Sequence, residues 1–242
     1  KLSDLLSMGV TLRYIYSNLA SGQYVSGTEI KPGMSVASDV SLYYQKPIEV
    51  KEKNATLSFG ANISNIGSKV TYTNSADKDF IPTNLGIGAA LNIELDEYNK
   101  LLITSDINKL LVPSPDSAVN GVYEYKNQSV ASGMFSSFAD APGGGTEEMR
   151  EVMYSFGAEY WYDNQFAVRG GYFHEHATKG NRKYMTAGLG LKLNVFGIGV
   201  SYLVPTNSQR NPLDNTLRFS LSFDFETFTA QYKKTTGSES SE

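Results

Sequence analysis

His174, Glu175 and His176 are neighbouring side chains that could take part in metal or acid–base chemistry. A His-x-His pair can hold a metal ion when a third ligand completes the site. The spacing offers no third ligand, and alternate residues of a strand often give this pattern by chance. We therefore predict no metal and no cofactor here.

Other catalytic patterns are equally weak. The chain has many serines but no nucleophile-elbow pattern that would pair one of them with a histidine. The run from Pro142 to Gly145 lacks the Lys-Ser or Lys-Thr pair that completes a phosphate-binding loop. The absence of cysteine removes disulfides, thiolate metal sites and cysteine nucleophiles. We predict that the protein is not an enzyme and has no catalytic residues.

The elements that position these residues alternate apolar and polar side chains, which is typical of β-strands. The first such stretch places Val10, Leu12 and Tyr14 on one face and Thr11 and Arg13 on the other. The pattern predicts strands at residues 8–17, 35–44, 54–65, 83–95, 100–109, 151–162, 165–173, 183–195, 198–203 and 215–225. Most of these segments are about as long as a tilted transmembrane strand, which has roughly 9 to 11 residues.

Nine charged side chains of these strands fall on the polar face. They are Arg13, Asp39, Glu94, Asp106, Glu159, Arg169, Lys192, Arg218 and Asp224. A charge that faces lipid is costly, whereas one that faces the inside of a barrel is tolerated. Aromatic residues near the ends of the apolar faces fit the boundary between lipid and water. The sequence therefore predicts an all-β fold, a transmembrane antiparallel β-barrel, located in the bacterial outer membrane and crossing it several times.

Composition agrees with this class. The formal net charge is −4, and the basic residues are scattered, which argues against a nucleic-acid partner. No apolar run reaches the length of a membrane helix.

The predicted connections alternate between long and short. Outer-membrane barrels have long extracellular loops and short periplasmic turns. We expect tight turns at Asp163–Asn164 and Phe196–Gly197. The long set lies at 18–34, 66–82, 110–150, 174–182 and 204–214, and the shorter set lies at 45–53, 96–99, 163–164 and 196–197.

The connection at 110–150 is unusually long, and we expect an irregular loop with a function. Its exposed aromatic and methionine side chains favour a surface that binds a protein partner. A loop folded over the barrel mouth as a plug is an equal alternative. The candidate partner-binding residues are Tyr123, Tyr125, Met134, Phe135 and Phe138, followed by His174, His176, Arg182 and Arg210 in two other long connections.

The C-terminal third carries a resemblance to a known family. Its motifs are Glu159-Tyr160-Trp161-Tyr162, the stretches 166–176 and 179–184, and the runs 201–205 and 211–219. Over residues 155–225 the chain resembles the PorV (LptO) family of the Bacteroidota type IX secretion system, and residues 8–20 resemble a strand of that family.

The resemblance implies a FadL-like barrel, which has fourteen strands in the family. On this basis we expect the chain to supply about the last ten strands, with residues 1–228 in the barrel domain and N-terminal strands missing before Lys1. Residues 229–242 are polar and are expected to form a disordered tail.

The resemblance also implies a non-enzymatic shuttle. Family members bind the C-terminal signal domain of cargo proteins and carry the cargo from the SprA (Sov) translocon to the PorU sortase attachment complex. Outer-membrane lipid or lipopolysaccharide is a further expected partner. The alternatives are a FadL-like channel for hydrophobic small molecules and a lipid A deacylase.

Overall fold

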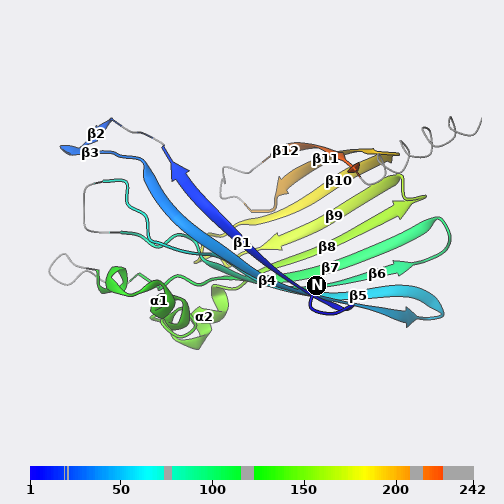
Figure 1. Ribbon diagram of the computed structural model, residues 1–242, viewed down its shortest axis with the longest axis horizontal. Helices are drawn as coiled ribbons and strands as arrows, with labels where there is room; N and C mark the ends of the chain where they lie inside the picture. The colour runs from blue at the N-terminus through cyan, green and yellow to red at the C-terminus, as the bar shows by residue number, and fades with distance from the viewer. Residues whose placement is uncertain (19, 21, 74–77, 116–122, 208–214, 226–242) are drawn as a thin grey trace, which may run out of the picture. The chain divides into compact units, whose positions relative to one another are not determined.

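The computed structural model describes residues 1–18, 20, 22–73, 78–115, 123–207 and 215–225 (Figure 1). The fold is all-β, and its main element is one antiparallel sheet of ten strands. Within the described residues, no helix is long and apolar enough to span a membrane.

The ten strands are paired in the order in which they occur along the chain. They are β1 (Leu6–Ser17), β4 (Gly33–Val50), β5 (Lys53–Gly67), β6 (Asn84–Glu94), β7 (Asn99–Leu110), β8 (Met153–Tyr162), β9 (Phe166–His174), β10 (Lys183–Leu193), β11 (Phe196–Pro205) and β12 (Leu217–Phe223). A separate small hairpin pairs β2 (Tyr24–Val25) with β3 (Thr28–Glu29). All ten predicted strands are confirmed, and most boundaries agree within about two residues.

The chain forms two compact units. The first comprises Lys1–Lys46, Ser58–Ala89 and Asp106–Tyr154, so it contains β1, β2, β3, most of β4 and the helices of the β7–β8 connection. The second comprises Pro47–Leu57, Ala90–Ser105 and Ser155–Glu242, and it contains most of β8 and all of β9 to β12.

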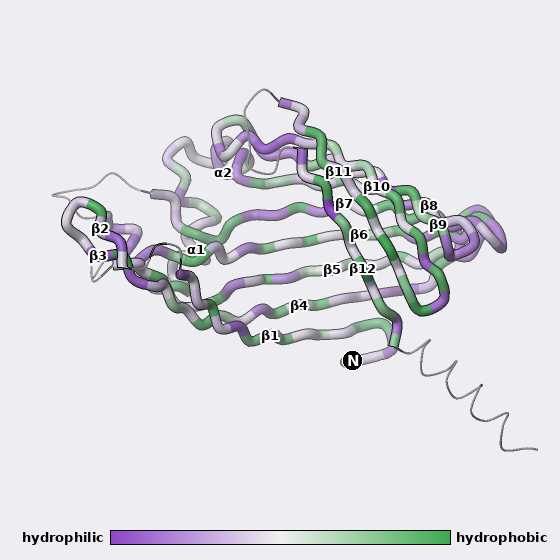
Figure 2. The backbone as a smooth tube through the Cα atoms, turned by 90° about the horizontal axis from the view of Figure 1, so that it is seen from above, coloured by the Kyte–Doolittle hydropathy of each residue, from purple (hydrophilic) through white to green (hydrophobic). Residues whose placement is uncertain are grey.

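Strand register in the second unit separates an apolar from a polar face. Val168, Leu189, Val200 and Phe219 stand opposite one another on four successive strands, and all four are exposed. The next row, from Arg169 through two small residues to Arg218, lies on the other face. Figure 2 shows the same alternation as green and paler segments along the strands. Neighbouring strands therefore present aligned side chains, as the sequence predicted.

The first unit has the same division. In β1 and β4, Leu12, Tyr14, Met34 and Val36 share one face and are exposed, whereas Arg13 and Asp39 have the opposite parity. The buried side chains of the described residues are mostly small or polar. Large apolar side chains thus cover an outer surface, which is the reverse of a water-soluble domain.

Short and long connections alternate along the chain, as expected. The short ones are residues 51–52, 95–98, 163–165 and 194–195, and the long ones are 18–32, 68–83, 111–152, 175–182 and 206–216. The predicted turn at Asp163–Asn164 is confirmed, because both residues have φ of 52°, which matches the twist of a tight hairpin.

Two turn predictions were wrong. Phe196 and Gly197 lie inside β11, and the turn falls at Asn194–Val195, where Asn194 adopts a φ of 49°. Asparagine tolerates this left-handed conformation, so glycine was not needed. The connection expected at 45–53 is only Lys51–Glu52, because β4 continues past Pro47 to Val50.

Candidate functional site

The connection between β7 and β8 contains three short helical segments, so the prediction of an irregular loop was wrong. They are η1 (Glu124–Asn127), α1 (Val130–Ser136) and α2 (Gly145–Arg150). Each has at most two turns, and helices this short form only when packing stabilises them. Their apolar spacing is too brief to be recognised in the sequence.

Helix α1 is fixed at its start and along one side. The Ser129 hydroxyl accepts a hydrogen bond from the Ser132 backbone N–H at 3.1 Å and caps the helix. Gly133 is buried, and a Cβ atom there would lie 2.8 Å from Pro113 Cγ and 3.0 Å from Phe80. Glycine therefore lets the helix backbone approach the residues that follow β7.

Helix α2 is attached to β7 by Lys109. Residues two apart share a face of a strand, so Lys109 lies on the apolar face with Ile107. Its Nζ is 2.9 Å from Glu148 Oε2 and 2.6 Å from Glu151 Oε2. The Lys109 side chain is only 10% exposed. The connection thus covers a charge that would otherwise be exposed on the apolar face.

Both carboxylates of this cluster have further hydrogen bonds. The Ala141 backbone N–H donates to Glu148 Oε1 at 2.7 Å, and the Ser114 hydroxyl donates to Glu151 Oε1 at 3.4 Å. A buried ion pair is favourable only when its remaining hydrogen-bonding capacity is also satisfied. This cluster meets that condition and holds both ends of the connection to the strand.

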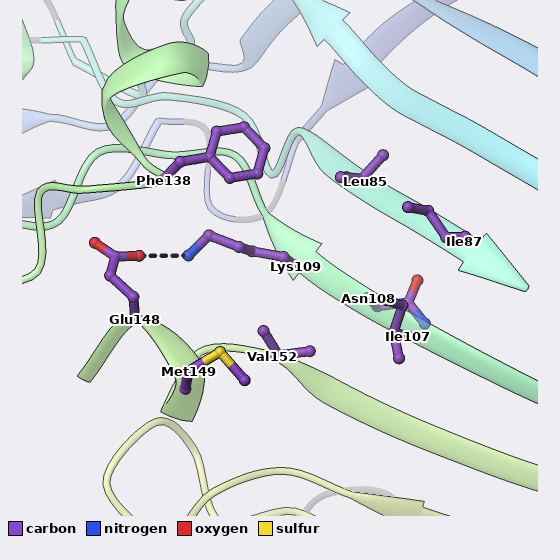
Figure 3. Close-up of a pocket in the computed structure, with 9 residues that line it drawn as sticks. All are labelled: Leu85, Ile87, Ile107, Asn108, Lys109, Phe138, Glu148, Met149 and Val152. Carbon is purple, nitrogen blue, oxygen red and sulfur yellow. Dashed lines mark hydrogen bonds and ion pairs between the residues drawn. The ribbon is translucent and has the colours of Figure 1, made fainter. Parts of the chain in front are cut away.

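An open groove of about 250 Å³ lies beside the ion cluster (Figure 3). Leu85 and Ile87 of β6 and Ile107 of β7 form one side. In Figure 3 the Phe138 ring lies on one side of the Lys109–Glu148 pair and the Met149 side chain lies on the other. The walls are mainly apolar, so the groove suits an apolar side chain or hydrocarbon group.

The connection exposes several large apolar side chains, and two of them, Phe138 and Met149, line this groove. Phe135 is 79%, Met149 62% and Phe138 50% exposed. We call Phe135, Phe138 and Met149 the apolar cluster of the connection. Because α1 and α2 are anchored at Gly133 and Lys109, these side chains stand on ordered backbone.

The other predicted residues of this connection are less exposed. Tyr123 and Tyr125 make an edge-to-face contact with ring centroids 6.0 Å apart, and Tyr125 and Met134 are half-buried. Their placement suggests packing within the connection as well as contact with a partner.

A second anchor links η1 to the β5–β6 connection. The Lys69 ammonium donates to the backbone carbonyls of Lys126 and Gln128 and lies 4.1 Å from the centre of the Phe80 ring. Burial lowers the pKa of Lys69. Lys126 in turn pairs with Asp79 at 2.8 Å. Two long connections therefore form one joined surface in the first unit.

His174, His176 and Arg182 come together in the second unit, at the β9–β10 connection. Arg182 donates to both oxygens of buried Glu175, from Nε and from NH2, each at 2.8 Å, and its backbone N–H donates at 3.1 Å. Burial alone would raise the pKa of Glu175, but these bonds and the Arg182 charge hold it below its ordinary value. The carboxylate therefore organises the connection.

The two histidines contact residues of their own connection or strand. The His174 ring lies near Tyr172, with centroids 6.3 Å apart, and His176 Nδ1 is 3.0 Å from the Thr178 hydroxyl. Within the described residues, no group of three or more His, Cys, Asp or Glu side chains is placed to hold a metal ion. Arg210 lies outside the described residues.

The sequence reasoning missed Lys109, Glu148, Met149 and Glu151. A signal for Lys109 was present, because it follows Ile103 and Ile107 at the apolar parity of its strand. A charge at such a position requires a neutralising partner. The sequence could not show which acidic residues are this partner, because Glu148 and Glu151 lie about forty residues further along the chain.

Comparison with known families gives a match over the first part of the chain. Residues 1–117 match the family model for the type IX secretion system protein PorV. The match covers 117 of the 242 residues, and this part of the chain is similar to the PorV family. The match covers β1 to β7 and includes residues 8–20, which resemble a strand of the family, whereas the other motifs lie at residues 155–225, beyond the match. No curated protein matches the chain.

The PorV match supports a role in type IX secretion. The all-β fold and its exposed apolar face are compatible with the outer membrane.

Proposed function

We propose that this protein is a non-enzymatic outer-membrane component of type IX secretion. It binds the C-terminal signal domain of cargo proteins and carries the cargo from the SprA (Sov) translocon to the PorU sortase attachment complex. The family supplies the secretion role, and the exposed apolar face of the strands supports a position in the membrane.

The observation that carries the binding role is the apolar cluster on the β7–β8 connection. Phe138 and Met149 are exposed at the wall of an apolar groove, and Phe135 is exposed on α1; two buried anchors hold this backbone in place. Aromatic and methionine side chains on ordered backbone are typical of the central part of a protein interface. We propose that the signal domain contacts this cluster.

The two rival functions have less support. A channel for hydrophobic small molecules needs an apolar interior, yet the polar face carries ion pairs such as Arg13–Asp39 and Arg169–Glu159. A deacylase needs a nucleophile beside a histidine; the Thr178 hydroxyl lies 3.0 Å from His176 Nδ1, but this contact joins residues two apart within one connection.

The test is direct binding of a purified signal domain to the full chain in mild detergent. We expect Phe135→Ala to weaken binding about tenfold or more, as for a central interface aromatic. Tyr24→Ala is the matched control, because Tyr24 is also a strongly exposed aromatic but lies in the β2–β3 hairpin. Equal affinity of the Phe135 and Tyr24 variants would contradict this contact surface.

Loss of binding to the translocon, with unchanged binding to the signal domain, would also contradict the assignment of this surface to cargo. Both variants must keep the strand content of the parent protein in circular dichroism. Retained strand content separates a lost contact from a lost fold.

A further inference from the structure

A second hollow of about 250 Å³ opens in the second unit, on the polar face of strands β8 to β12. Its lining includes Trp161, Arg169 and Lys192, together with Ser220 and Ser222. This hollow is separate from the apolar groove, and neither the catalytic nor the partner-binding readings of the sequence included it.

Glycines form its floor. Strand register aligns Gly190, Gly199 and Ser220 on neighbouring strands, and Gly197 lies opposite Ser222 in the next row. A Cβ atom at Gly190 would lie 2.8 Å from Arg169 NH1. The missing side chain thus lets the guanidinium lie close to the backbone of the sheet.

Arg169 is oriented by one carboxylate and one ring. Its Nε donates to Glu159, which also accepts from the indole N–H of Trp161. The guanidinium carbon is 5.5 Å from the centre of the Trp161 ring. Among the described residues, the two terminal nitrogens of Arg169 have no hydrogen-bond partner. These nitrogens remain available as a fork of donors.

Lys192 adds a second cation. Its Nζ is 3.5 Å from Asp224 Oδ2, a long contact, and its side chain is 48% exposed. Neither Glu159 nor Asp224 lines the hollow, so its charged lining is wholly cationic. In the described part of β8 to β12 and the residue that follows, the polar face has three cations, with Arg218 as the third, against two carboxylates.

We propose that this hollow binds a small soluble ligand through a carboxylate or phosphate group. The oxyanion accepts hydrogen bonds from the terminal nitrogens of Arg169 and pairs with Lys192, while the Ser220 hydroxyl supplies a further donor. The glycine floor leaves room for the group, and the Trp161 ring contacts the organic part of the ligand. This site is independent of the proposed contact with cargo.

Trp161 is the only tryptophan of the chain, so its fluorescence reports directly on the hollow. The probes are inorganic phosphate and benzoate, titrated into the full chain in neutral detergent at constant ionic strength set with sodium chloride. We expect a saturable change in emission with both. Lys192→Gln should weaken binding about tenfold, because it removes a charged partner of the anion.

Two alanine variants form a matched pair. A Cβ atom at Gly199 would protrude into the hollow with ordinary contacts, 3.6 Å from Ser220 Cβ and 3.8 Å from Arg169 NH1. Gly199→Ala should therefore weaken binding without harming the fold. Gly170→Ala adds the same methyl group on the opposite face, where nothing lies within 4 Å, and should leave binding unchanged.

Absence of a saturable change in the parent protein would overturn the proposal, as would equal affinities of the parent and the Lys192 and Gly199 variants. A further arm replaces the free anions with phosphatidylglycerol in mixed micelles. A response to that lipid without a response to free phosphate or benzoate would also overturn it, because the ligand would then be a headgroup.

Discussion

Lys109 shows what a single charge requires on the apolar face of a strand. Its ammonium is shared by Glu148 and Glu151 and is almost fully covered by the β7–β8 connection. Lys109→Met keeps the length of the side chain but leaves two carboxylates without their cation. We expect this change to destabilise the connection by about 3 kcal/mol. Hydrogen exchange of residues 130–152 measures that local loss.

The matched control for Lys109→Met is the triple variant that also carries Glu148→Gln and Glu151→Gln. Replacing a whole ion cluster by uncharged groups costs much less than removing one partner. The triple variant should therefore recover most of the protection. Equal exchange in the single and triple variants would show that the charges are not what holds α2.

Glu175 predicts a pH dependence of the β9–β10 connection. Its pKa in the folded protein is lower than in the unfolded chain, where it is about 4.3, because the bonds from Arg182 outweigh the effect of burial. The stabilisation is complete above that value and is lost as the pH falls through the folded pKa. Hydrogen exchange of residues 175–182, corrected for intrinsic rates, should rise in acid. The same pH dependence in Glu175→Gln would contradict this origin.

At the residue scale, parity alone predicted the polar face for charges such as Arg13 and Asp39, although Lys109 was missed. The sequence could not predict partners that lie far along the chain, such as Lys109 with Glu148. Nor could it show that Glu175, between the two histidines, pairs with Arg182. Such pairings depend on how connections fold back on the strands.

At the element scale, ten strands were predictable because alternation over nine or more residues is a strong signal. The helices α1 and α2 were not, because each is short and is stabilised by contacts with other segments. The turn near Val195 was misplaced by two residues because Phe196 and Gly197 have a turn-like composition, whereas Asn194 adopts the required left-handed conformation.

Gly133 tests the packing of α1. Gly133→Ala places a Cβ atom against Pro113 and Phe80, and we expect a cost of about 1–3 kcal/mol in the local stability of the connection. Limited proteolysis between residues 123 and 152 measures the effect. Gly145→Ala, at the start of α2 with nothing within 4 Å, is the control and should not increase cleavage. Similar cleavage of both variants would argue against close packing at Gly133.

At the scale of the whole molecule, the apolar face should contact lipid. Leu12 is exposed on that face at the middle of β1, and Thr11 lies on the polar face opposite Asp39. We expect Leu12→Lys to destabilise the membrane-inserted protein by about 2–4 kcal/mol. Thr11→Lys gains an opposite charge and should cost little. Unfolding by urea from lipid vesicles compares them, and equal costs would contradict a lipid-facing β1.

The apolar cluster of the β7–β8 connection is proposed to contact the signal domain of cargo. Photo-crosslinking in secreting cells tests this contact most directly, with the reactive group placed at Phe135 or Met149 and, as controls, at Tyr24 or Leu12. We expect cargo adducts that contain the C-terminal signal domain from the first two positions only. Cargo adducts from the control positions alone, or no cargo adducts from Phe135 and Met149 during active secretion, would contradict it.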